Sequence, residues 1–159
     1  MLNSGRPART RILFICHGNI CRSPMAEFVM KELAQKAGLA SQFHIESAAA
    51  SREEIGNPVY PPARRKLAEH GVSCGGHRAR QITRRDYDEF DRLIGMDTSN
   101  LRDMRRIFGG DPAGKLSRLL DWTERPGDMS DPWYTGDFES AWRDVDAGCR
   151  ALLSALGQK

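Results

Sequence analysis

The sequence predicts an α/β fold of three layers, in which helices cover both faces of an open, parallel, four-stranded sheet. Three observations lead to this prediction. Short apolar or alternating runs of strand length recur along the chain, helical patterns separate them, and glycine or proline stands at many of the boundaries. Strands that alternate with helices form a parallel sheet, because each right-handed crossover returns the chain to the same edge.

The first strand ends in a polar loop that precedes a helix. Residues 11–16 are apolar after the opening arginine, which is typical of a buried parallel strand. After the loop, Ser23 is a good N-cap and Pro24 suits the first helical position. We therefore expect a helix over residues 24–37, with Gly38 at its end.

The rest of the chain continues this alternation. Further strands are expected over residues 43–47, 90–96 and 116–120, and further helices over residues 62–70, 83–88, 98–107 and 136–156. A turn should follow the second strand at residues 48–51, and residues 121–131 should form a polar loop. Thr83 is the expected N-cap of its helix, and Thr98 or Ser99 caps the next one.

The length of the chain indicates a single domain. With 159 residues it can bury one sizeable core, so we expect one domain over residues 11–159 after a disordered lead-in at 1–10. A formal net charge of +3 is poor evidence for a nucleic-acid partner. No apolar stretch has the length of a membrane span or a secretory signal. A cytoplasmic, monomeric protein without nucleic-acid or membrane partners is expected.

The four cysteines do not have the spacing of a disulfide framework or a zinc site. Reduced thiols are therefore expected, with no metal. Cys74 and Cys149 are expected to be chemically inert.

The loop from Cys16 to Arg22 carries the candidate chemistry. It lies at a helix N-terminus, where free backbone N–H groups and the helix dipole favour an anion and stabilise a thiolate. Arg22 can bind two phosphate oxygens at once, Gly18 lets the backbone approach a ligand, and Asn19 tolerates a left-handed turn. The alternatives are a buried structural cysteine and a solvated arginine. In open parallel sheets, ligands bind beyond the carboxyl ends of the strands, where this loop lies.

The spacing of cysteine and arginine belongs to a longer pattern. The chain reads Cys16-His-Gly-Asn-Ile-Cys-Arg-Ser-Pro-Met-Ala-Glu27 near its start and Asp131-Pro-Trp-Tyr134 near its end, with further matches at 47–49, 54–58, 77–82 and 96–103. From about residue 11 to residue 156 it resembles a low-molecular-weight protein tyrosine phosphatase. The resemblance implies hydrolysis of phosphotyrosine in a protein or peptide through a phosphocysteine intermediate, without a cofactor.

The resemblance also implies a role for each residue of the loop. Cys16 would be the nucleophile, and the phosphate-binding residues would be His17, Gly18, Asn19, Ile20, Cys21, Arg22 and Ser23. The same loop would accept phosphate, sulfate or vanadate. Asn19 would hold the loop open against Ser47 and His77, and the Ser23 hydroxyl would donate to the sulfur of Cys16.

A carboxylic acid must protonate the oxygen that leaves when phosphate is transferred to the cysteine. Asp131 is the candidate, because Pro132 fixes the chain after it and the segment matches the acid loop of the resembled family. Asp97, Asp121 and Asp128 are competitors. Cys21, five residues after Cys16, could trap an oxidised Cys16 as a disulfide, or it could simply be a packed thiol.

Substrate choice is less clearly indicated. Glu53 stands where the resembled family usually has an aromatic residue, so one wall of the cleft for the phenol ring would be missing, whereas Trp133 and Tyr134 would form the other. His17 lies next to the nucleophile at a position that varies in the family and could alter its thiolate fraction. The alternatives are a protein-arginine phosphatase, an arsenate reductase or a non-catalytic phosphoprotein-binding module. The resembled arginine phosphatases have threonine where this chain has Ile20.

Overall fold

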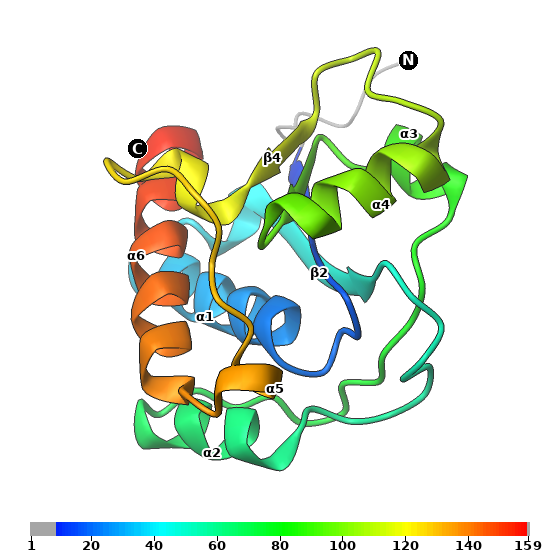
Figure 1. Ribbon diagram of the computed structural model, residues 1–159. Helices are drawn as coiled ribbons and strands as arrows, with labels where there is room; N and C mark the ends of the chain where they lie inside the picture. Colours follow the sequence, from blue (N-terminus) through cyan, green and yellow to red (C-terminus); the bar gives the residue numbers. More distant parts are fainter. Residues whose placement is uncertain (1–8, 159) are drawn as a thin grey trace.

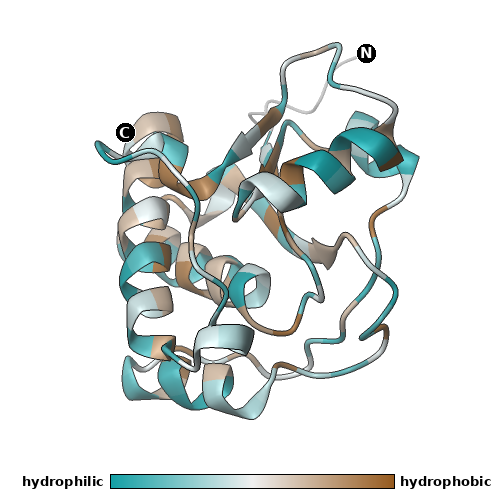
Figure 2. Ribbon diagram, in the orientation of Figure 1, coloured by the Kyte–Doolittle hydropathy of each residue, from teal (hydrophilic) through white to brown (hydrophobic). Residues whose placement is uncertain are grey.

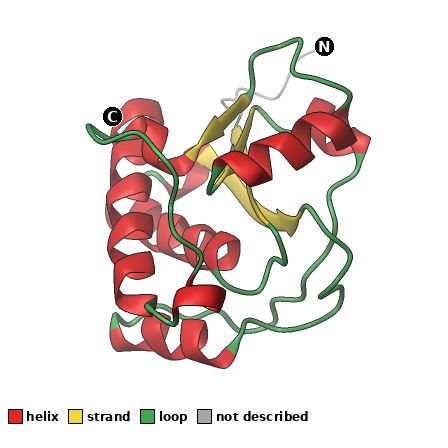
Figure 3. Cartoon of the chain, viewed as in Figure 1, coloured by secondary structure: helices red, strands yellow, loops and turns green. Residues whose placement is uncertain are grey.

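A computed structural model, which describes residues 9–158, confirms the predicted fold class. Its four strands are all parallel and form one sheet in the order β2-β1-β3-β4. Helices lie around the strands of this sheet (Figure 3). The strands are β1 (Thr10–Cys16), β2 (Phe43–Ala49), β3 (Arg92–Gly95) and β4 (Leu116–Arg118).

Helices cover both faces of this sheet (Figure 1). They are α1 (Arg22–Lys36), α2 (Pro61–Glu69), α3 (Arg84–Glu89), α4 (Thr98–Phe108), α5 (Pro132–Thr135) and α6 (Phe138–Leu156), with 3₁₀ turns at Ala40–Gln42 and Leu119–Trp122. The side chains of β1 divide the core between the two faces, because successive residues of a strand point to opposite sides. Ile12 and Phe14 belong to the cluster beneath α1 and α6, whereas Leu13 and Ile15 belong to the cluster beneath α3 and α4.

The hydropathy of the chain follows these layers. Apolar colours mark strands of the sheet, whereas strongly hydrophilic positions alternate with apolar ones along α4 (Figure 2). The four described residues Ile12 to Ile15 are completely buried. This explains why the first strand reads as a nearly continuous apolar run, as strands covered on both faces do.

The strand order makes the carboxyl end of β1 a topological switch point of the sheet. The chain leaves β1 through α1 to reach β2 on one side, and then crosses to β3 on the other side of β1. The connections that leave neighbouring strands at such a point diverge and create a crevice at their carboxyl ends. The loop that begins at Cys16 therefore lies where a ligand site is expected.

Several element boundaries differ from the prediction for identifiable reasons. The second strand continues through Ala49 instead of turning at residue 48, because Ala48 and Ala49 pair with Ile15 and Cys16. The predicted strands at 90–96 and 116–120 are shorter in the structure, and the short helix α5 was not predicted. The last helix begins at Phe138, with Asp137 as its N-cap, instead of at residue 136.

Two predicted helix caps were wrong, and one was right. Thr83 does precede α3, where its N–H donates to Asp86 Oδ2 at 2.8 Å. Asp97, and not Thr98 or Ser99, caps α4 by accepting a hydrogen bond from the Asn100 N–H at 2.8 Å. The N-cap of α1 is Cys21 rather than Ser23, so Ser23 lies inside the first turn.

The predicted lead-in at 1–10 lies mostly outside the described residues, and within it Thr10 already belongs to β1. None of the helices in residues 9–158 is long and apolar enough to cross a membrane.

Candidate active site

The loop between β1 and α1 lines a pocket at the carboxyl edge of the sheet. Three segments that lie far apart in the sequence surround this pocket, whose volume is about 100 Å³. The lining residues are Cys16, His17, Gly18, Ile20, Cys21, Arg22, Glu53, Glu54, Asp131, Trp133 and Tyr134. The structure thus brings the predicted nucleophile, arginine and acid to one cavity, together with both sides of the predicted substrate cleft.

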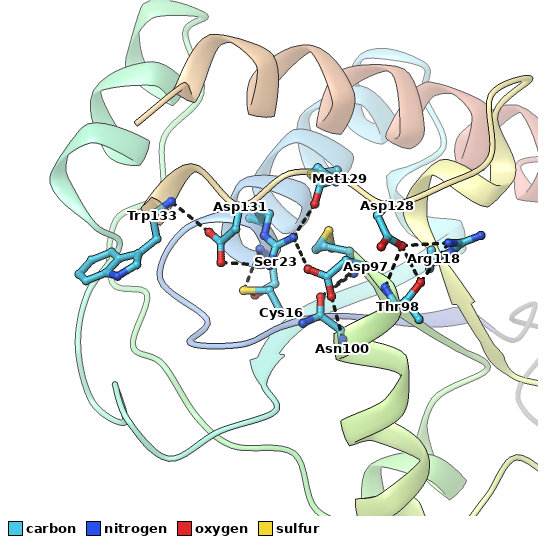
Figure 4. Close-up of polar contacts among 12 residues, drawn as sticks. Cys16, Ser23, Asp97, Thr98, Asn100, Arg118, Asp128, Met129, Asp131 and Trp133 are labelled. Atoms are coloured by element: carbon cyan, nitrogen blue, oxygen red, sulfur yellow. Dashed lines mark hydrogen bonds and ion pairs between the residues drawn. The ribbon is translucent and has the colours of Figure 1, made fainter. Parts of the chain in front are cut away.

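Hydrogen-bond donors converge on the sulfur of Cys16. The backbone N–H groups of Asn19 and Ser23 point to Sγ at 3.3 and 3.4 Å. The Ser23 hydroxyl lies 3.0 Å from the sulfur (Figure 4). Such donors stabilise a negative charge on the sulfur, and the start of α1 adds the positive end of its dipole. The Ser23 hydroxyl, which does not cap α1, instead contacts the sulfur.

The other described thiols lie in environments that oppose ionisation. Burial, reinforced by the neighbouring charges of Cys16 and Asp131, raises the pKa of the Cys21 thiol. Burial also raises the pKa of Cys74, against the opposing charge of Arg64, and the pKa of Cys149. These three thiols are therefore expected to stay protonated at neutral pH.

Arg22 is buried beneath the pocket and held by three groups. Its Nη1 donates to Asp97 Oδ2 at 2.8 Å and to the carbonyl oxygen of Met129 at 2.9 Å, and its Nη2 lies 3.3 Å from Asp131 Oδ2. Burial alone would lower the pKa of the guanidinium, but the charges of Cys16 and Asp131 and the hydrogen bond to Asp97 raise it instead. A fixed cation therefore lies within reach of any anion that enters the pocket.

Asp131 faces this arginine from the start of α5. Its Oδ1 accepts a hydrogen bond from the Trp133 N–H at 3.0 Å, so the carboxylate is the N-cap of that short helix, and Pro132 occupies the first helical position. Of the competing carboxylates, Asp97 shares Arg22 with Asp131, whereas Asp121 binds Arg118. Asp128 binds the Thr98 N–H and Arg118.

Asn19 is the centre of a hydrogen-bond network that holds the loop. It is the one residue other than glycine with positive φ (60°) among the described residues. Its Nδ2 donates to the hydroxyls of Ser23 and Ser47, each at 2.9 Å, and its Oδ1 accepts from the Arg80 N–H at 3.3 Å. The imidazole of His77 contacts the Asn19 carbonyl oxygen at 2.9 Å.

Replacing Asn19 is expected to disorder this loop. Asn19→Ala removes three side-chain hydrogen bonds and leaves a left-handed backbone without a tolerant residue, which should reduce the free energy of unfolding by about 3 kcal/mol. Asn19→Gly removes the same bonds but relieves the backbone strain, so its loss should be about 1 kcal/mol smaller. Urea unfolding measures both values. Equal stability of Asn19→Ala and the unaltered protein would contradict this account of the loop.

The rim of the pocket is acidic on one side and aromatic on the other. Glu53 contacts the imidazole of His17, and Glu54 also lines the cavity. Across the pocket, Trp133 packs against Tyr60 with ring centroids 4.9 Å apart, whereas Tyr134 is 82% exposed. The aromatic wall therefore consists mainly of Trp133.

Comparison with known proteins identifies the family. A family model described as low molecular weight phosphotyrosine protein phosphatase matches residues 11–159. The chain belongs to this family. The phosphatase is 40% identical over 147 residues to the low molecular weight protein-tyrosine-phosphatase YfkJ of Bacillus subtilis, a match that covers 91% of this chain and 94% of the relative.

Solved structures agree with this assignment. A crystal structure of YfkJ from Bacillus subtilis superposes with a TM-score of 0.92 at 39% identity and covers 96% of the phosphatase and 97% of that chain. A second one, of the Drosophila arginine phosphatase DARP, superposes with a TM-score of 0.82 at 28% identity and covers 93% and 98% of the two chains. The protein is therefore a low molecular weight protein tyrosine phosphatase by family and by fold.

Some residues of the phosphatase site had no predicted role. Glu27 is buried in α1, where its Oε1 accepts a hydrogen bond from the Ser47 hydroxyl at 2.6 Å and lies 4.0 Å from His77 Nδ1. Asp97, which the sequence offers only as a competitor of Asp131 for the role of the acid, holds the guanidinium of Arg22. Its position directly after β3 is a signal that could have found it, because the carboxyl ends of β1 and β3 lie side by side.

Proposed function

We propose that this protein hydrolyses phosphotyrosine in proteins or peptides through a phosphocysteine on Cys16. The observation that supports this most directly is the set of donors on the sulfur, two backbone N–H groups and one hydroxyl within 3.4 Å. They favour the thiolate, which is the nucleophilic form of a cysteine. The family assignment gives independent support to a phosphotyrosine substrate.

In the first step, the thiolate of Cys16 attacks phosphorus, and an S–P bond forms as the ester P–O bond breaks. The backbone N–H groups of the loop and the guanidinium of Arg22 stabilise the charge on the phosphoryl oxygens. Electrons of the broken bond remain on the phenol oxygen, which needs a proton. Asp131, 3.3 Å from Arg22 and at the pocket wall, supplies it.

In the second step, water attacks the phosphocysteine. Asp131, now ionised, accepts a proton from this water, the S–P bond breaks, and its electrons return to Cys16 as a thiolate. The Ser23 hydroxyl, 3.0 Å from the sulfur, stabilises that leaving thiolate. Asn19, Ser47 and His77 act as positioning residues that keep the loop amides directed into the pocket.

Several features favour an aromatic substrate over phosphoarginine. The bulk of Ile20 lines the pocket at the position where the resembled arginine phosphatases have threonine, and Trp133 with Tyr60 offers a surface for a ring. An arginine phosphatase is the second candidate, because a structure of one superposes on this chain. The proposal includes a role for Cys21, which would form a disulfide with an oxidised Cys16 and so protect it from further oxidation. It also includes a cytoplasmic location, because thiols stay reduced in that compartment.

The choice between these substrates can be measured with two peptides of the same sequence, one phosphorylated on tyrosine and the other on arginine. We expect kcat/KM to be at least about tenfold higher for phosphotyrosine, which corresponds to a difference of about 1.4 kcal/mol in transition-state stabilisation. Vanadate should inhibit both reactions, and a chelator should inhibit neither. A preference for phosphoarginine would assign the protein to the second function, and turnover of neither peptide would reject both.

A further inference from the structure

A second groove lies beside the active pocket and has no role in the proposed chemistry. Its volume is about 410 Å³, and it shares Ile20 and Glu54 with the pocket that holds Cys16. Its other lining residues come from the segment that leads into α2 and from the first turns of that helix: Asn57, Pro58, Val59, Tyr60, Pro61, Arg64 and Arg65. The groove therefore adjoins the site where a phosphorylated side chain would bind.

Hydrogen bonds hold this groove to the phosphate loop. The Tyr60 N–H donates to the carbonyl oxygen of Ile20 at 2.8 Å, and the Tyr60 ring packs on Trp133 of the pocket wall. Glu54, on the boundary between the two cavities, accepts a hydrogen bond from Asn57 Nδ2 at 3.0 Å. The groove is thus formed by the same backbone that forms the pocket, and its position relative to Cys16 is fixed.

The charges along the groove change sign with distance from the pocket. Glu53 and Glu54 lie at the pocket, whereas Arg64 and Arg65 are exposed on α2. The neighbouring Lys66 pairs with Glu69 and Glu139, but within residues 9–158 neither of these two arginines has a carboxylate partner at ion-pair distance. They are therefore available to an acidic group outside the chain.

We propose that this groove binds the chain that flanks the phosphotyrosine of a substrate, and that Arg64 and Arg65 select an acidic side chain in that flank. The inference rests on the proposed phosphotyrosine phosphatase activity. Acidic residues next to the phosphotyrosine are disfavoured by Glu53 and Glu54, so the favoured acidic residue lies further along the peptide. The large apolar side chains that are exposed in residues 9–158 are Ile55, Trp133 and Tyr134. Trp133 and Tyr134 line the active pocket, and Ile55 follows Glu54, which lines both the pocket and the groove. These three side chains supply apolar contacts that a polypeptide, rather than a small phosphate ester, can use.

The test is a set of phosphotyrosine peptides with alanine flanks, in which one glutamate is moved through five positions on each side. For each enzyme variant, the measured quantity is the ratio of kcat/KM between each glutamate peptide and the all-alanine peptide. We expect a ratio of about three to five at a position at least two residues from the phosphotyrosine, the size typical of an exposed charge pair. This ratio should fall towards one in about 0.5 M salt, because salt screens such pairs.

The decisive variant is the double charge reversal Arg64→Glu with Arg65→Glu, in which the ratio should fall to one or below. The matched control reverses two exposed arginines on the other face of the sheet, Arg85→Glu on α3 and Arg102→Glu on α4, and changes the net charge equally. The control should keep the ratio. If no position gives a gain, or if the gain persists without Arg64 and Arg65, the groove does not select acidic flanks. Failure of the unaltered enzyme to hydrolyse any peptide of the set would instead reject the proposed function.

Discussion

Replacing Cys16 by serine is expected to reduce hydrolysis of an aryl phosphate by about ten-thousandfold or more. A serine hydroxyl is far less ionised at neutral pH than a thiol held by the N–H groups of Asn19 and Ser23, so no competent nucleophile remains. The amides of the loop and the guanidinium of Arg22 are unchanged by this substitution. Phosphate should therefore still bind, which calorimetry can measure beside the loss of turnover.

The matched control for this experiment is Cys74→Ser. This variant makes the same chemical change at a buried cysteine outside the pocket. It should be less stable than the unaltered enzyme, but its folded fraction should keep most of the activity. Appreciable turnover by Cys16→Ser would remove the basis for a cysteine nucleophile. Loss of phosphate binding together with activity would show that the substitution had damaged the loop rather than the chemistry alone.

Replacing Asp131 by asparagine is expected to have the second largest effect, and one that depends on the leaving group. Hydrolysis of phosphotyrosine should slow by about 100-fold or more, because the phenolate of tyrosine is basic and needs a proton in the transition state. Hydrolysis of 4-nitrophenyl phosphate should slow less, because 4-nitrophenolate leaves without full protonation. The asparagine side-chain oxygen can still accept the Trp133 N–H, so α5 keeps its cap.

Asp128→Asn is the control for this substitution. It lies three positions earlier in the same loop, but its carboxylate binds Thr98 and Arg118 instead of Arg22. In this variant the ratio of the rates on phosphotyrosine and 4-nitrophenyl phosphate should stay equal to that of the unaltered enzyme. An equal loss on both substrates in Asp131→Asn would indicate a different general acid, and Asp97 would be the next residue to replace, since it contacts the same arginine.

The fold could be predicted from the sequence because its main signals are local. The apolar run into Cys16 and the glycine at 38 report burial and chain reversal directly, and the alternation of strands and helices then fixes a parallel sheet. The local rules failed where a tertiary partner took the side chain. Ser23 has the chemistry of an N-cap, but the Cys16 sulfur and Asn19 occupy its hydroxyl in the folded chain.

The site was predictable only in part, for the same physical reason. The apolar strand before Cys16 and the helix start after Arg22 together indicate an anion loop. The partners of that loop, however, come from strands and loops that only the fold brings together. Nothing local signals that Glu27 accepts from Ser47 or that Glu53 contacts His17. The groove at Arg64 could not be predicted from the sequence either, because only the fold places it beside the active pocket.

The most direct test of the central claim is to trap the covalent intermediate. The enzyme is mixed with a ³²P-labelled aryl phosphate, quenched with acid during turnover, digested, and the labelled peptide is identified by mass spectrometry. The account predicts one phosphoryl group on the peptide that contains Cys16, bound to its sulfur, and no label in Cys16→Ser. Turnover without a covalent phosphoryl group, or with the group on another residue, would contradict it.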